Sequence, residues 1–307
     1  MPVTATRARW AAEIEARANT YWTDERTTQL LGDKQLAIRP REGAVLLRAL
    51  GLLRDDASLP PAQARKYFQI NHMVALLGPA LRVLRERHGA IRLLDVGCGR
   101  SYLTLLLVWC ARHVWNHALE VHGIDRDAAV VAEASRRAEL SGLADAVRFE
   151  VGDVAALADR EVHGVVALHA CDTATCEALA FGIRVGADVL AVAPCCQAEL
   201  ARGWEALAER GVDGAFAPVW RMPQLRRETA ADITDAMRVE LVRAAGYDVR
   251  AMEFVPAAHT RKNTLIQAIR AAVPDARIDP AYEHLRDATG GIDIRLARML
   301  GRAKRSD

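Results

Sequence analysis

The chain has 307 residues, of which 51% are hydrophobic and 26% are charged, so it can bury a large core and keep a polar surface. No apolar run approaches the ~18 residues of a membrane span, and none opens the chain as a leader segment. The six cysteines form no C-x-x-C pair, which argues against the disulfide framework of a small secreted protein. The sequence therefore predicts a reduced, cytoplasmic protein without a membrane partner. Its net charge of +2 neither requires nor excludes a nucleic-acid partner.

Residues 1–88 are predicted to be mostly helical, with breaks at Pro40 and at Pro60–Pro61. From residue 90 to about residue 270, short apolar runs alternate with longer segments of helical spacing. Seven runs are candidate strands: "IRLLDVG", "LEVHGID", "AVRFEVGD", "HGVVALHA", "ADVLAVAP", "DVRAMEFVP" and "NTLIQAI". The helical segments between them include Leu103–Val114, Ala128–Leu140, Thr173–Ile183 and Ala230–Ala245. This alternation predicts an α/β fold with a doubly wound, mostly parallel, Rossmann-like sheet of seven strands.

The same pattern divides the chain into three segments. Residues 1–88 form an N-terminal helical extension, residues 89–272 form the α/β domain, and residues 273–307 form a partly helical tail with a basic end. The strand runs are apolar throughout, so they are expected to be covered on both faces. Ligands of such sheets bind outside the carboxyl ends of the strands, so the residues that follow each run are the first candidates for a site.

The stretch "LLDVGCGRSYLTLLL", residues 93–107, carries the sharpest functional signal. Its strand ends at Asp95, and Gly97 and Gly99 allow a tight turn that comes close to a ligand. A dinucleotide fold would require a third glycine where Tyr102 stands, and no P-loop lysine follows the turn. An acid beside the turn favours a cationic ligand over a diphosphate. The pattern indicates S-adenosylmethionine, which carries a sulfonium and no phosphate.

Acids after the second and third strand runs agree with this ligand. Asp125 ends "HGID" and can accept hydrogen bonds from both ribose hydroxyls, and Asp153 ends "EVGD" and can accept one from the adenine amino group. With Asp95, three acids follow three successive strands. The alternative is an ordinary glycine turn with surface acids around it.

His and Cys residues gather after the fourth and fifth strand runs. "HACDTATCEAL" contains His169, Cys171 and Asp172, and "VAPCCQ" contains Cys195 and Cys196. If the strand order is that of a methyltransferase, these two runs lie side by side and form the wall of the reaction cleft. His169 or Asp172 would then accept a proton, with the two cysteines as shape or nucleophile.

Two other interpretations of the cysteines stay open. A zinc site could use His169, Cys171, Cys195 and Cys196, although their spacing differs from the usual structural patterns, and the prediction is therefore that no metal is bound. The remaining cysteines are expected to be small buried hydrophobic residues: Cys98, Cys110 and Cys176.

Two further segments carry candidate contacts. Lys66 and Gln69 stand three residues apart on a predicted helix ahead of the α/β domain, where Lys66 could reach the substrate or the methionine carboxylate. The alternative is a solvated polar stripe. "WRMPQLRRE", residues 220–228, combines a tryptophan with three arginines, which could hold a phosphate and stack a base. The alternative there is a loop whose arginines extend into solvent.

With these motifs, the chain resembles the class I S-adenosylmethionine-dependent methyltransferases. Within that class it is similar to the group that contains the eukaryotic tRNA 2′-O-methyltransferase of the acceptor stem and its bacterial relatives. The segments that carry the resemblance are "RKYFQINHMVALLG", "LLDVGCGRSYLTLLL", "HACDTATCEAL" with "PCCQ", and "HTRKNTLI". The chain differs from that group at Asp172 and Gln197, and it has no zinc-binding modules like those of the tRNA enzyme.

The resemblance implies a role for each candidate residue. The implied contacts with S-adenosylmethionine are Asp95, Gly97, Gly99, Asp125 and Asp153. The implied acceptor pocket consists of Lys66, His169, Cys171, Cys195 and Cys196. The predicted catalytic residues are His169, Asp172, Cys195, Cys196 and Lys66. The sequence thus predicts an enzyme that methylates RNA, either tRNA or rRNA. A protein or small-molecule acceptor, a non-catalytic binding module and a zinc- or redox-dependent protein stay as alternatives, and no oligomeric state is predicted.

Overall fold

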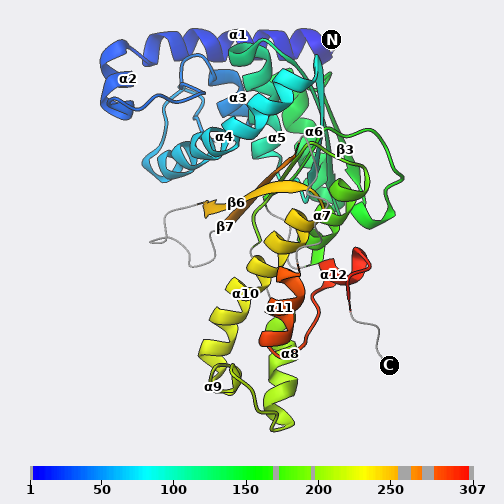
Figure 1. Ribbon diagram of the computed structural model, residues 1–307. Coiled ribbons are helices and arrows are strands. Elements are labelled where there is room, and N and C mark those ends of the chain that lie inside the picture. The colour runs from blue at the N-terminus through cyan, green and yellow to red at the C-terminus, as the bar shows by residue number, and fades with distance from the viewer. Residues whose placement is uncertain (1–2, 169–172, 195–197, 255–263, 272–279, 304–307) are drawn as a thin grey trace. The chain divides into compact units, whose positions relative to one another are not determined.

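The computed structural model describes residues 3–168, 173–194, 198–254, 264–271 and 280–303 (Figure 1). Its strands are hydrogen-bonded in one seven-stranded sheet, in the order β3-β2-β1-β4-β5-β7-β6. Strand β7 runs antiparallel to both β5 and β6, whereas β1–β2, β2–β3 and β4–β5 are parallel pairs. The strands are β1 Ala90–Val96, β2 Ala118–Asp125, β3 Val147–Val151, β4 Gly164–Ala167, β5 Val189–Val192, β6 Tyr247–Glu253 and β7 Thr264–Arg270. The predicted mostly parallel, Rossmann-like sheet of seven strands is confirmed.

The chain forms two compact units, Met1–Gly152 and Asp153–Asp307. The first unit contains the N-terminal helical region and strands β1 to β3, and the second contains strands β4 to β7. The domain boundaries expected after residues 88 and 272 fall inside these units, and they stay a prediction.

Capping and proline residues mark the starts of two helices in the first unit. Thr23 caps the second helix by accepting from the Arg26 N–H, and the break expected at Pro60–Pro61 is the start of a long helix. Proline suits this first helical position because its missing N–H would have no helical partner there. The helices are α1 Val3–Tyr21, α2 Asp24–Leu31, α3 Ala44–Ala49, α4 Pro61–Arg87, α5 Tyr102–Cys110, which continues into a π-helical turn Ala111–Trp115, and α6 Ala128–Ser141.

Buried polar side chains of α4 hold the loop that follows α2. The Tyr67 hydroxyl donates to the Ile38 carbonyl (2.7 Å), and the Asn71 side-chain oxygen accepts from the Ile38 N–H (2.9 Å). Both side chains are almost fully buried, so each bond satisfies a polar group that would otherwise be costly to desolvate. These bonds therefore fix the loop between α2 and α3 to α4.

Helix α5 is apolar along its length, and eight of its nine residues are buried. Nine residues rise only about 14 Å, far less than the ~30 Å of a bilayer core. Among the described residues, no helix combines the length and apolar character needed to cross a membrane. The apolar character of α5 is that of a core helix.

The second unit carries a group of helices whose packing the sequence pattern did not predict, although one of them covers most of the predicted segment Ala230–Ala245. Helices α8, α9, α10 and α11 pack together in the lower part of Figure 1. Trp204 and Trp220 are fully buried among them, and the Trp204 Nε1 donates to the Thr289 carbonyl (2.7 Å). The unit's helices are a 3-10 turn Val154–Ala156, α7 Thr173–Arg184, α8 Ala198–Glu209, α9 Ala217–Trp220, α10 Pro223–Ala244, α11 Ala281–Ala288 and α12 Arg295–Met299.

Residues 220–228 do not form a base-stacking loop, which was one of the two interpretations of this segment. Trp220 ends α9 and is 1% exposed, so its ring is not available to stack on a base. Pro223 begins α10 rather than interrupting a helix. Arg221 is paired with Asp213 (2.5 Å), and Arg226 is paired with Glu205. The segment closes the helical core of this unit instead.

Gly182 in α7 is expected to tolerate no side chain. A Cβ there would overlap Leu190 Cδ2 and lie 3.1 Å from Val165 Cγ2. Gly182→Ala should lower the free energy of unfolding by about 1–3 kcal/mol, because overpacking outweighs the gain in helix propensity.

The matched control is Gly78→Ala in α4, where a Cβ meets nothing within 4 Å. That variant should raise the free energy of unfolding by up to about 1 kcal/mol. Urea unfolding of both variants checks the pair. Equal stability of Gly182→Ala and the wild type would contradict the packing of α7 described here.

Candidate functional site

The glycine turn between β1 and α5 has the backbone that its sequence requires. Gly97 and Gly99 have φ angles of 66° and 54°, a region that glycine enters without steric cost. The N–H groups of Gly97 and Cys98 both donate to the Ile124 carbonyl, at 2.8 and 3.0 Å. Since Val96 is also the register partner of Ile124, the turn is fixed to the end of β2.

The carboxylate of Asp125, at the end of β2, faces this turn. Its Oδ2 accepts from the Gly99 N–H (2.9 Å), and its Oδ1 accepts from the Asp127 N–H (3.0 Å). The side chain is half-buried. A carboxylate has about four lone-pair sites, so two accepted bonds leave capacity for two hydroxyl donors. This is the acceptor set that a ribose diol requires.

The backbone beside Asp125 is open at Gly99. A Cβ built on Gly99 meets only the Gly97 carbonyl oxygen within 4 Å, at 3.9 Å. A ligand can therefore approach the Gly99 backbone closely while Asp125 holds the turn. The residues present fit the hydrogen-bonding needs of a nucleoside ligand, and the Gly99 backbone leaves room for its approach.

Asp95 is engaged inside the first unit. It is 4% exposed, and it accepts a hydrogen bond from Thr104 Oγ1 of α5. Burial, and to a smaller extent the nearby Asp125 charge, raises the pKa of Asp95, whereas the Thr104 bond lowers it. The combined effect is a pKa of about 6. Asp95 thus joins β1 to α5, and its expected contact with the donor stays a prediction.

Three cysteines are packing residues, as the sequence predicted. The buried ones are Cys98, Cys110 and Cys176. Burial raises the pKa of each thiol, to about 12 for Cys110, and for Cys98 the charges of Asp95 and Asp125 add to this effect. A thiol that stays protonated at neutral pH is a poor nucleophile.

An arginine of α6 supports the turn from its other end. Arg137 Nη1 donates to the Arg100 carbonyl (2.9 Å), and Arg137 Nε donates to Glu133 (2.8 Å). The Arg137 guanidinium lies 4.9 Å from the Tyr102 ring centroid. Sequence reasoning did not single out Arg137; its only signal is the Glu–Arg spacing of four residues, which is common on helices.

Tyr102 links Lys66 to the same network. The Lys66 ammonium lies 3.6 Å from the centroid of the Tyr102 ring, and the Tyr102 hydroxyl donates to the Leu50 carbonyl (3.2 Å). Cation–π contacts of this kind stabilise by about 0.5–2 kcal/mol. Lys66 is therefore held at the helix that follows the glycine turn, and its expected role toward the substrate stays a prediction.

The remaining candidates lie in the second unit. Asp153 Oδ1 accepts from the Ala155 N–H (3.0 Å) and caps the 3-10 turn, while its role toward adenine stays a prediction. The four acceptor candidates of this unit lie outside the described residues: His169, Asp172, Cys195 and Cys196. Within the described ranges, no group of three or more His, Cys, Asp or Glu side chains could hold a metal ion.

Comparison with known proteins shows what part of this region is similar to. Residues 65–203 match the family described as a methyltransferase domain. The match covers less than half of the chain, and it shows that this part is similar to methyltransferase domains. The match includes the glycine turn and the acids at or near the carboxyl ends of β1, β2 and β3.

One curated relative is the uncharacterized protein YjhP of Escherichia coli strain K12. It is 36% identical over 95 residues, which are 31% of this chain and 32% of YjhP. The aligned part thus spans about a third of the length of that relative. The finer resemblance to the tRNA 2′-O-methyltransferase group stays a prediction.

The solved structures that resemble this chain have lower sequence identity than this curated relative. Magnesium protoporphyrin IX methyltransferase from Synechocystis PCC 6803 with bound SAH is 16% identical, with a TM-score of 0.38 over 84% of this chain and 99% of that one. SAH-bound PaMTH1 of Podospora anserina is 14% identical, with a TM-score of 0.43 over 81% and 95%. YjhP itself is 17% identical in its X-ray structure, with a TM-score of 0.34 over 65% and 92%. Likeness at this level says nothing of the acceptor.

Asp95→Asn should change the pH dependence of stability. The pKa of Asp95 is higher in the folded protein than its ordinary value of 3.8, so folding favours the protonated acid. That favourable contribution is complete below pH 4 and is lost as the pH rises through 6. An asparagine oxygen can still accept from Thr104 without a charge.

The variant should therefore exceed the wild type in free energy of unfolding by about 1–3 kcal/mol at pH 8, and the difference should shrink toward pH 4. Urea unfolding at pH 4, 6 and 8 measures it. A variant that is less stable than the wild type at pH 8 would rule out this account of Asp95.

Proposed function

We propose that the whole protein is an S-adenosylmethionine-dependent methyltransferase that binds its donor at the glycine turn of the first unit. The observation that carries this proposal is the pairing of Asp125 with the Gly99 N–H, next to backbone that is open to a ligand. Asp125 would hold the ribose hydroxyls, Gly97 and Gly99 would allow close approach, and Asp153 would accept from the adenine amino group. Asp95 would keep β1 and α5 together beneath these contacts.

Methyl transfer would require the protein to position the two reactants and to accept one proton. When bound, S-adenosylmethionine supplies an electrophilic methyl group on a cationic sulfonium. Holding the acceptor in line with that group would provide most of the rate, because orientation replaces a bimolecular encounter. His169 would accept the proton that the acceptor loses, with Asp172 as the alternative base. Cys195 and Cys196 would form the wall that orients the acceptor.

RNA is the acceptor class that we propose. Support comes from the resemblance of four segments to the tRNA 2′-O-methyltransferase group and from the basic composition, in which 37 of the 41 basic residues are arginine. Arginine binds phosphate through two parallel hydrogen bonds, which lysine cannot do. A protein or small-molecule acceptor, or a module that binds the donor without transfer, would give different outcomes in the labelling experiment below.

Asp125→Asn should weaken binding of S-adenosylmethionine by about 10–100-fold, since hydrogen bonds to a charged acceptor are worth about 1.5–3 kcal/mol. The matched control is Asp127→Asn, two residues further on. Asp127 caps α6 by accepting from the Ala129 N–H (2.8 Å), and asparagine caps helices equally well.

Calorimetric titration of the donor into both variants and the wild type makes the comparison. The control should retain wild-type affinity. Equal affinity for all three proteins would remove Asp125 from the donor site, and no heat with the wild type would remove the donor site itself.

Labelled RNA is the expected product of incubation with radiolabelled S-adenosylmethionine. The acceptors to offer are RNA, protein and small-molecule fractions from cells that lack the gene. His169→Ala should slow labelling by about 10²–10⁴-fold with unchanged donor affinity, because it removes the base and leaves the donor contacts.

His284→Ala, an exposed position on α11, serves as the control and should label normally. Label in the protein or small-molecule fraction would replace the RNA assignment. Donor binding without label in any fraction would favour a non-catalytic module.

A further inference from the structure

A cavity lies in the first unit between helices α1, α3 and α6. Its volume is about 250 Å³, and Trp10, Arg48, Arg136 and Arg137 contribute the aromatic and charged parts of its wall. The other lining residues are uncharged, so every charge that lines this cavity is an arginine. We call it the arginine cavity.

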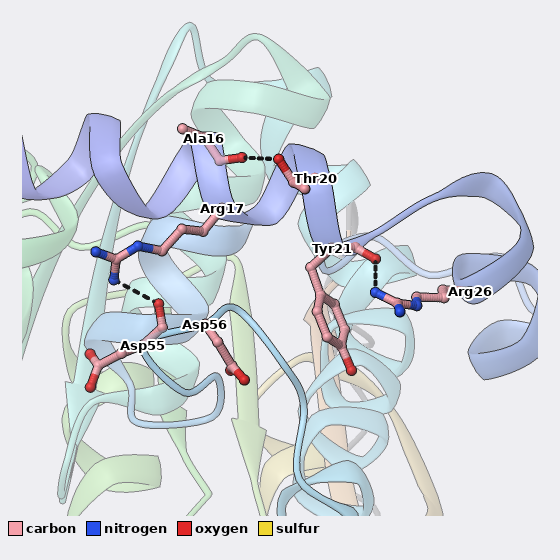
Figure 2. Close-up of a pocket in the computed structure, with 7 residues that line it drawn as sticks. All are labelled: Ala16, Arg17, Thr20, Tyr21, Arg26, Asp55 and Asp56. Carbon is pink, nitrogen blue, oxygen red and sulfur yellow. Dashed lines mark hydrogen bonds between the residues drawn. The ribbon is translucent and has the colours of Figure 1, made fainter.

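A neighbouring groove shows what makes the arginine cavity different. That groove has a volume of about 660 Å³ and is lined by Arg17 and Arg26 but also by Asp55 and Asp56 (Figure 2). Figure 2 shows that Arg17 donates to the backbone carbonyl of Asp55, on the same wall as the two carboxylates. An anion in that groove would meet negative charge as well as positive charge. In the arginine cavity, the charged residues of the wall are all positive.

The three guanidiniums share two carboxylates that lie outside the cavity wall. Arg48 Nε donates to Asp55 (3.1 Å), and Arg136 binds both oxygens of Glu133, at 2.7 and 2.8 Å. Arg137 Nε donates to the same Glu133. Three positive charges against two negative ones leave the group with a net charge of +1. Each guanidinium has five N–H donors, so these bonds leave donors on all three for a ligand.

The arginines are also held in place before any ligand arrives. The hydrogen bonds from Arg136 and Arg137 hold the pKa of Glu133 at about 2, so this carboxylate stays charged and keeps both guanidiniums fixed at neutral pH. Arg137 is 7% exposed and is bonded to the Arg100 carbonyl as well. Fixed donors lose less entropy on binding than mobile side chains do.

We propose that the arginine cavity binds a phosphate group, with the Trp10 indole contacting the organic part of the ligand. Planar guanidiniums match the oxygens of phosphate in pairs, and an aromatic face beside them suits a nucleotide base or sugar. The cavity is slightly smaller than the usual 300–1,000 Å³ of drug-sized ligand sites, which fits a phosphate with a small attached group. The phosphate could belong to an RNA chain or to a free phosphorylated molecule.

This site does not depend on the proposed methyl transfer. Arg137 connects it with the donor site, because Arg137 lines the cavity and also bonds the glycine turn at Arg100. Arg137 is therefore a poor choice for a test, because its replacement would disturb both places. Arg136 suits better, since its side chain is 56% exposed and Glu133 keeps Arg137 as a partner when Arg136 is replaced.

The test is calorimetric titration of pyrophosphate, and separately of a short single-stranded oligouridylate, into the full chain at low salt. Arg136→Gln should weaken pyrophosphate binding by at least about tenfold, the value of one charge-assisted hydrogen bond. Arg48→Gln should have a similar effect. Arg26→Gln in the groove of Figure 2 is the matched control and should bind as the wild type does. Thermal melts of all variants confirm that they are folded.

Each outcome decides something. Weakened binding of both probes in Arg136→Gln supports the site and assigns it to RNA, whereas weakened pyrophosphate binding with unchanged oligouridylate binding supports it for a free phosphorylated molecule. No heat from pyrophosphate with the wild type, or equal affinity in Arg136→Gln and Arg26→Gln, overturns the proposal. Titration of S-adenosylmethionine into Arg136→Gln keeps the two proposals apart, because the donor should bind normally.

Discussion

The hydrogen bond from the Gly99 N–H to the Asp125 carboxylate is the interaction on which the candidate site depends. It holds a left-handed backbone turn against the end of a neighbouring strand. Ligands of open α/β sheets bind at this edge, outside the carboxyl ends of the strands. Without it, an acid at this position would be one more solvated surface charge. With it, the acid has a fixed direction and the turn has a fixed shape, so both are ready before a ligand binds.

Contacts with α5, α6 and the N-terminal helices further stabilise this turn. Asp95 joins β1 to the start of α5 through Thr104, and Arg137 bonds the Arg100 carbonyl while it lies over the Tyr102 ring. Tyr102 in turn reaches the N-terminal helices through Lys66 and Leu50. The N-terminal helical region therefore helps to fix Tyr102, which follows the glycine turn where the donor would bind.

The strands and the donor side of the site could be predicted from the sequence, because both follow from local patterns. All seven apolar runs became strands, and Gly97, Gly99 and Asp125 lie together because each stands at or just after a strand end. Strand direction was harder, since the apolar period is the same for parallel and antiparallel pairs. The antiparallel β7 is an example, because its run looks like the others.

Features that depend on contacts between distant residues could not be predicted. Arg137 acts on a carbonyl 37 residues away, and nothing in its own sequence neighbourhood marks that partner. The packing of helices α8 to α11 could not be predicted for a related reason: it brings Trp204 to the Thr289 carbonyl, 85 residues later.

The placement of the indole rings has a spectroscopic consequence. Trp204 and Trp220 are fully buried in the second unit, with ring centroids 6.3 Å apart, whereas Trp22 and Trp109 are buried in the first. Each compact unit thus carries its own intrinsic fluorophores in an apolar environment. Loss of native packing in either unit would expose its indoles to water and shift their emission to longer wavelength, so single-tryptophan variants could report on the two units separately.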